Sequence, residues 1–109
     1  MRHILFACFI ILAGVISGCG RPITEPEFAG FCYQFTDGET GPGCSDIIPI
    51  CNAYRIVMNT DHGSRNACFQ ACRDIARPQR QRFAFTGCAA GVEHAAGWCQ
   101  RYCASAYPR

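Results

Sequence analysis

The sequence predicts a mainly α-helical, disulfide-stapled domain of about three helices, with at most a short strand or hairpin. The chain has 109 residues, a length that suits one domain. Ten residues are cysteine, and two pairs have the spacing Cys-x-x-x-Cys, which places both sulfurs on one face of a helix. After residue 18, Ile, Val and Phe make up only 14 of 91 residues and leucine is absent. Disulfides must therefore supplement a thin apolar core.

A secretory signal peptide is predicted over residues 1–18. A basic start precedes an apolar run over residues 4–16, which is shorter than the roughly 20 residues of a transmembrane helix. The sequence Ile16-Ser17-Gly18-Cys19 that follows resembles the lipobox of bacterial lipoproteins. This resemblance implies that Cys19 is lipidated and becomes the first residue of the mature chain.

The same resemblance implies a location in the cell envelope. Gly20 stands where an aspartate would favour the inner membrane, so we expect attachment to the outer membrane, facing the periplasm or the exterior. The alternative is a secreted cysteine-rich toxin or effector that is cleaved near Gly18 or Gly20. Both routes lead to an oxidising compartment, in which disulfides persist.

The mature chain divides into a tether over residues 19–30 and one domain over residues 31–109. Two prolines and little periodicity predict that the tether is extended and mobile. Alternating aromatic residues over 31–35 predict a short strand, and the glycine-rich run over 37–43 predicts a loop.

Helical periodicity recurs three times in the rest of the chain. We expect a first helix over residues 46–58, a second from a cap at Ser64 to a stop at Arg77-Pro78, and a third from a cap at Thr86 to Ala106. Phe83 and Phe85 suggest a short extended piece between the last two.

Eight cysteines remain after Cys8 in the signal peptide and Cys19 are set aside, and eight is an even number, as four disulfides require. In an antiparallel helix pair, equal spacings match Cys68 with Cys103 and Cys72 with Cys99. Three pairings are open for the other four, of which we expect Cys32 with Cys44 and Cys51 with Cys88. The eight are Cys32, Cys44, Cys51, Cys68, Cys72, Cys88, Cys99 and Cys103.

The twin Cys-x-x-x-Cys pattern is similar to that of the mitochondrial small Tim chaperones and of plant hairpin peptides. The 26 residues between Cys72 and Cys99, and the four additional cysteines, depart from those families. The resemblance therefore implies a helical hairpin and carries no activity to this chain. Neither zinc-site nor haem-attachment spacings occur, and we expect no metal and no cofactor.

Charge is unevenly distributed along the mature chain. Residues 20–72 have three Arg and six acidic residues, whereas residues 73–109 have six Arg and two acidic residues. Such a basic segment suits an anionic envelope component or an acidic protein, and nucleic acid is not expected. The predicted contact surface combines the basic segment with exposed aromatic residues, namely Arg77, Arg80, Arg82, Trp98, Tyr102 and Tyr107.

Two histidines remain in the mature chain, and each follows an acidic residue. His62 follows Asp61 and His94 follows Glu93, but adjacent residues of a helix point about 100 degrees apart and do not form an acid–base dyad. We therefore expect a lipid-anchored protein with a structural or binding role and no catalysis. A small periplasmic hydrolase that uses His62 or His94 is the remaining alternative.

Overall fold

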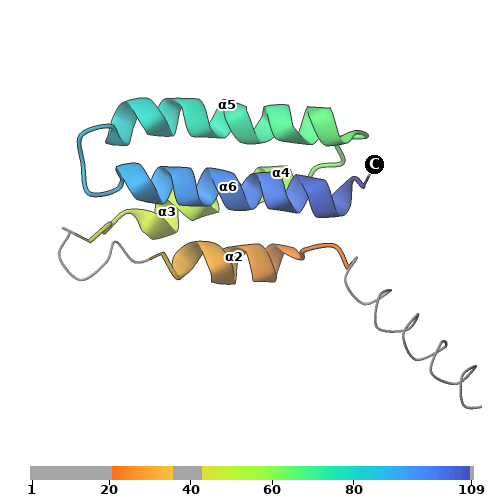
Figure 1. Cartoon of the computed structure of the whole chain (residues 1–109), viewed down its shortest axis with the longest axis horizontal. Helices are drawn as coiled ribbons and strands as arrows, with labels where there is room; N and C mark the ends of the chain where they lie inside the picture. Colours follow the sequence, from red (N-terminus) through yellow and green to blue (C-terminus); the bar gives the residue numbers. More distant parts are fainter. Residues whose placement is uncertain (1–20, 36–42, 109) are drawn as a thin grey trace, which may run out of the picture.

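The computed structural model describes residues 21–35 and 43–108, and within these ranges every regular element is a helix. Helices α5 and α6 lie side by side (Figure 1). The shorter helices α2 and α3 pack on α6, and the four-residue helix α4 packs on α5. The predicted fold class is confirmed, because the described part is mainly helical and holds four disulfides. No described helix is long and apolar enough to cross a membrane.

The antiparallel pair consists of α5 (Arg65–Phe83) and α6 (Ala89–Ala106). Ser64 caps α5 as expected, since its side chain accepts a hydrogen bond from the Ala67 amide at 3.1 Å. The predicted disulfides between these helices, Cys68–Cys103 and Cys72–Cys99, are both present. We refer to α5 and α6 together as the hairpin.

Helix α5 ends later than the sequence predicts, at Phe83 and not at Arg77-Pro78. The helix continues through Pro78 to Phe83, and the extended piece predicted at Phe83 and Phe85 is a helix end and a turn. Proline removes one backbone hydrogen bond, but Pro78 is exposed, where water can solvate the freed carbonyl group. Ala76 and Phe83, on either side of Pro78, are buried and hold the helix against the core.

Helix α2 (Glu25–Tyr33) replaces both the extended tether and the short strand, so these two predictions are wrong for residues 25–33. The Thr24 hydroxyl accepts from the Glu27 amide at 3.3 Å and donates to the Glu27 carboxylate at 3.0 Å. This pair of hydrogen bonds between residues three apart, which we call the reciprocal cap, is typical of a helix N-terminus. It outweighs the alternation of aromatic residues, which favours a strand. Phe28 and Cys32, one turn apart, are buried, so α2 belongs to the domain.

The predicted helix over residues 46–58 is broken into α3 (Ile47–Asn52) and α4 (Arg55–Met58). The turn at Ala53 and Tyr54 reorients the chain, and Tyr54 and Val57 are both buried. The Tyr54 ring packs against Phe28 of α2 with ring centroids 6.1 Å apart. Packing against α2 thus interrupts a helix that the periodicity favours.

The two remaining disulfides differ from the expected pairs. Cys32 bonds to Cys51 and joins α2 to α3, whereas Cys44 bonds to Cys88 and joins the start of α3 to the start of α6. Gly91 permits this approach, because a Cβ atom there would lie 3.2 Å from Ile47 Cδ1 and 3.4 Å from Cys44 Sγ. The expected pairs, Cys32 with Cys44 and Cys51 with Cys88, are wrong because α2 is a helix that packs on α3 and places Cys32 next to Cys51.

Both ends of the described chain meet at the free end of the hairpin, away from the α5–α6 turn (Figure 1). The Ile23 amide donates to Ser105 Oγ at 3.0 Å. The Arg65 guanidinium donates to the backbone carbonyls of Tyr107 and Ala104 at 2.8 and 3.1 Å, which satisfies carbonyl groups left open at the end of α6. We call this the terminal end and the opposite one, at the α5–α6 turn, the turn end.

Candidate functional site

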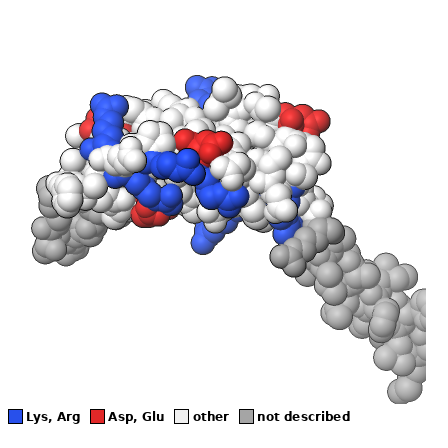
Figure 2. Space-filling view, turned by 90° about the horizontal axis from the view of Figure 1, so that it is seen from above, with Lys and Arg blue, Asp and Glu red and all other residues white. Residues whose placement is uncertain are grey.

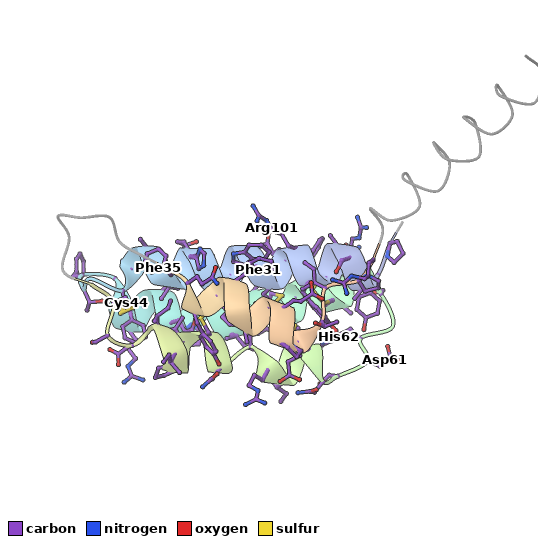
Figure 3. All side chains as sticks on the ribbon, turned by 90° about the horizontal axis from the view of Figure 1, so that it is seen from below. Phe31, Phe35, Cys44, Asp61, His62 and Arg101 are labelled. Atoms are coloured by element: carbon purple, nitrogen blue, oxygen red, sulfur yellow. A yellow bond between two sulfur atoms is a disulfide. The ribbon has the colours of Figure 1, made fainter. Side chains whose placement is uncertain are left out.

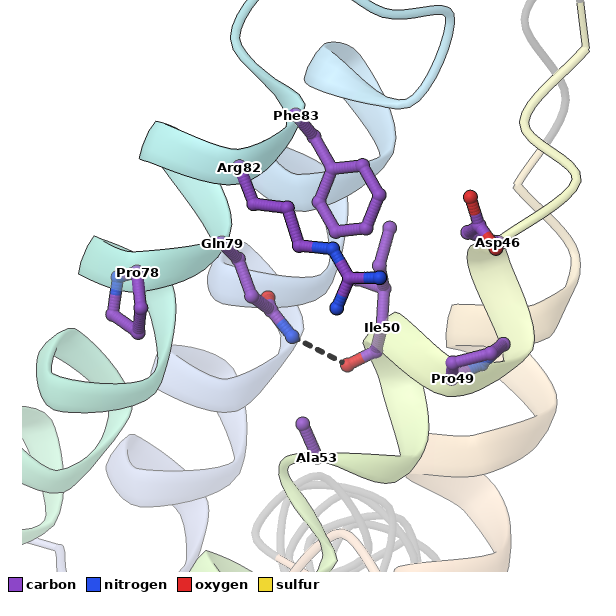
Figure 4. Close-up of a pocket in the computed structure, with 8 residues that line it drawn as sticks. All are labelled: Asp46, Pro49, Ile50, Ala53, Pro78, Gln79, Arg82 and Phe83. Carbon is purple, nitrogen blue, oxygen red and sulfur yellow. Dashed lines mark hydrogen bonds between the residues drawn. The ribbon is translucent and has the colours of Figure 1, made fainter.

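A groove of about 310 Å³ lies between α3 and α5 near the turn end (Figure 4). We call it the α3–α5 groove. Two prolines and an exposed alanine contribute much of its apolar lining, Phe83 closes one part of it, and charged side chains stand on opposite walls. The residues that line it are Asp46, Pro49, Ile50, Ala53, Pro78, Gln79, Arg82 and Phe83.

Polar groups of the groove come from both helices. On α5, Gln79 Nε2 donates to the Ile50 carbonyl at 3.1 Å, which bridges the two walls (Figure 4). The Arg82 guanidinium lies over the Phe83 ring, with Cζ 5.2 Å from the ring centroid. On α3, Asp46 occupies the N-cap position, but its exposed side chain makes no capping hydrogen bond. The groove therefore offers a cation on one wall and a carboxylate on the other.

The three arginines predicted as a contact surface lie in the second half of α5, but they are not equivalent. Arg80 is bound by Glu93 of α6 through two hydrogen bonds of 2.6 and 3.1 Å. This contact lowers the pKa of Glu93 and raises that of Arg80. Figure 2 shows basic side chains beside acidic ones on this face. Arg82 lines the groove and Arg77 does not. The three arginines therefore have three different surroundings.

The three aromatic residues predicted as exposed beside those arginines are instead half-buried, and each contacts a segment outside α5. Trp98 stacks on Phe31 of α2, with ring centroids 4.3 Å apart, and Arg101 Cζ lies 4.6 Å from the Trp98 ring (Figure 3 labels Phe31 and Arg101). The Tyr102 hydroxyl donates to the Met58 carbonyl at 3.2 Å.

Burial raises the pKa of Tyr102. Tyr107 is also half-buried, and its hydroxyl accepts from the His62 amide at 2.8 Å. These rings hold α6 against its neighbours. The antiparallel course of the hairpin places the end of α6 far from the arginines at the end of α5.

Each histidine contacts a backbone carbonyl. His62 Nε2 lies 2.9 Å from the Val57 carbonyl, and His94 Nε2 lies 3.0 Å from the Phe31 carbonyl. Asp61, next to His62, accepts hydrogen bonds from the Gly63 amide and the Tyr107 hydroxyl (Figure 3 labels Asp61 and His62). The His94 ring and the Asp61 carboxylate thus join segments that are far apart in the sequence, and the His62 ring joins the turn after α4 to the Val57 carbonyl.

Sulfur atoms also cluster in the core of the hairpin. Cys72 Sγ and Cys103 Sγ, which belong to different disulfides, are 3.4 Å apart, and Cys68 Sγ is within 4.8 Å of both. Each of the three is in a disulfide, and only a thiolate is a strong metal ligand. Cys19, the predicted lipidation site, lies outside the described residues.

Sequence reasoning found Arg82 but missed the other residues of the groove. Asp46 and Pro49 are about thirty residues from Pro78 and Gln79, and no local pattern links two such segments. Comparisons with protein-family models, curated proteins and solved structures found no match to this chain.

Proposed function

We propose that the protein is a lipid-anchored binding domain of the cell envelope that is attached to the outer membrane through Cys19 and has no catalytic role. Its partner is another envelope component or an incoming protein. The lipobox-like sequence supports the anchor, and the α3–α5 groove supports binding.

The observation that carries this proposal is the hydrogen bond that fixes Ile23 at the terminal end of the domain. Arg21 and Pro22 are exposed at the terminal end, and the domain is tied in from Ile23 onward by the hydrogen bond to Ser105. Only three residues lie between Cys19 and Ile23, and the four Cα-to-Cα steps that join them span at most about 14 Å. A lipid on Cys19 would therefore hold the terminal end close to the membrane.

This geometry also orients the rest of the domain. The groove is near the turn end, and 18 residues of α6 span about 27 Å. A domain held by its terminal end thus presents the groove away from its own anchor, where a partner can reach it. The polar side chains considered as catalytic, His62 and His94, instead contact backbone carbonyls, which supports a binding role over a hydrolytic one.

Mass spectrometry of the mature N-terminus tests the proposal. The full chain is expressed in a bacterium with lipoprotein processing, and we expect a first residue Cys19 that carries acyl chains, in the outer-membrane fraction. Cys19→Ala is the matched control and should leave the chain uncleaved or free of lipid. A free N-terminus at Arg21 and recovery in the medium would instead support a secreted protein and overturn the anchor.

A further inference from the structure

We propose that the α3–α5 groove binds a peptide segment of a partner protein in which a large apolar side chain stands next to a carboxylate. This inference rests on the proposed function as a binding domain and names the chemistry of its partner. The groove side chains are those defined above, between α3 and the second half of α5.

The size of the groove suits one inserted side chain. Along α5 it extends from Pro78 to Phe83, six residues of helix that rise about 7.5 Å from the first to the last. Its volume of about 310 Å³ is at the small end of ligand sites. An aromatic ring or a leucine fills such a space, whereas a long acyl chain would project from it.

Charge complementarity indicates which group of the partner stands next to its inserted apolar side chain. Among the described residues, Arg21, Arg55 and Arg80 each form an ion pair with a glutamate, whereas Arg82 forms none. The Arg82 guanidinium lies over Phe83 at the groove wall, and its planar fork of donors matches a carboxylate. A partner carboxylate would supply the acceptor that Arg82 does not find among the described residues.

The opposite wall favours a peptide over a simple organic acid. Asp46 presents an exposed carboxylate that makes no capping hydrogen bond, and this group accepts from backbone N–H groups. A peptide offers both an acidic side chain for Arg82 and N–H donors for Asp46. A carboxylic acid without amide groups can satisfy only the first.

Two large apolar side chains close in sequence to groove residues are exposed. Ile48, next to Pro49, is 55% exposed, and Phe85, two residues after Phe83, is fully exposed. Exposed large apolar side chains are typical of protein–protein interfaces.

A titration followed by amide NMR shifts tests the proposal on the full chain in detergent micelles. The probe is the acetylated and amidated pentapeptide Gly-Glu-Phe-Glu-Gly. We expect saturating shifts at Ala53 and Gln79, with a Kd on the order of 1 mM for so short a ligand. Matched peptides with Lys in place of Glu, or Ala in place of Phe, should not saturate at the same concentrations.

Variants then locate the contact. Arg82→Gln should weaken binding about tenfold, because it removes a charge-assisted hydrogen bond. Arg77→Gln, an exposed arginine of the same helix outside the groove, should leave binding unchanged. Ala53→Glu, at an exposed position of the other wall, narrows the groove and adds a like charge, and should abolish binding.

Three results would overturn the proposal: equal weakening by the Arg77 and Arg82 variants, equal binding of the lysine peptide, or binding of phenylpropionate as tight as that of the peptide. Mass spectrometry of the same sample reports lipidation separately. Peptide binding by a chain without lipid would retain this inference and overturn only the anchor.

Discussion

The hairpin and the three short helices packed on it are built in different ways. In the hairpin, two helices of 19 and 18 residues run side by side and are joined by two disulfides with matched spacing. In the layer of α2, α3 and α4, helices of nine, six and four residues meet through single buried rings and one disulfide, Cys32–Cys51. Helices this short are not stable alone, so the layer depends on contacts with the hairpin.

This difference predicts an order of stability within the molecule. The hairpin can keep its helices when the layer is disturbed, because its own disulfides and buried alanines hold it together. The layer cannot persist without the hairpin, because α2 and α3 pack on α6 and α4 packs on α5.

Removal of both hairpin disulfides should unfold the whole domain. The four alanine substitutions at Cys68, Cys72, Cys99 and Cys103 remove two covalent links, each typically worth about 2–4 kcal/mol, and leave cavities in the core. Far-UV circular dichroism should show loss of most helix. The double variant Cys44→Ala/Cys88→Ala should keep the hairpin amides protected in hydrogen exchange, and equal loss of helix in both variants would contradict this order of stability.

Phe28→Ala should reveal that α2 is part of the domain and not of a tether. Phe28 is 1% exposed, and truncation of such a ring typically costs about 3–5 kcal/mol. Urea unfolding followed by circular dichroism measures this loss. Gln34→Ala, at the exposed C-cap position of the same helix, is the control and should change the free energy of unfolding by less than about 0.5 kcal/mol.

Tyr54 should make the domain sensitive to alkaline pH. Burial raises its pKa from 10.0 to about 12, and its hydroxyl has no hydrogen-bond partner among the described residues. Above pH 10 the unfolded chain loses this proton while the folded chain retains it, so the free energy of unfolding falls between pH 10 and 12, by on the order of 2 kcal/mol.

Tyr54→Phe tests this origin of the alkaline sensitivity. The variant should lose most of the pH dependence and gain about 1 kcal/mol at neutral pH, because it removes an unpaired buried hydroxyl. Chemical denaturation at several pH values measures both effects. Tyr33→Phe removes only an exposed hydroxyl that donates to Asn52 Oδ1, and it should retain the alkaline pH dependence of the natural chain. An unchanged alkaline profile in the Tyr54 variant would assign the sensitivity to another group.

Arg80→Gln should have the smallest effect. The ion pair with Glu93 is solvent-exposed on both sides, so its loss should cost less than about 1 kcal/mol and less still in high salt. The lowered pKa of Glu93 means that the stabilisation is present above the ordinary glutamate pKa and disappears as pH falls through the lowered value. Thermal unfolding at pH 7 and at pH 3 should show a larger difference between variant and natural chain at pH 7 than at pH 3.

The candidate site was only partly predictable from the sequence. Arg82 stands out in a basic segment, and the reciprocal cap of Thr24 and Glu27 could have revealed α2, since its spacing is a known helix-start pattern. Asp46, Ala53 and Gln79 carry no such signal. They become neighbours only because the disulfide between Cys44 and Cys88 holds the start of α3 near the turn end.

The helical class, the cap of α5 at Ser64 and the two disulfides of the hairpin could be predicted from the sequence alone, because cap residues and Cys-x-x-x-Cys spacing act within one or two turns of helix. Three features depend on tertiary contacts: α5 continues past Pro78, the helix predicted over residues 46–58 is interrupted at Tyr54, and Cys32 bonds to Cys51. In these places the local preference is worth at most a few kcal/mol, and burial of rings and sulfurs between elements far apart in the sequence outweighs it.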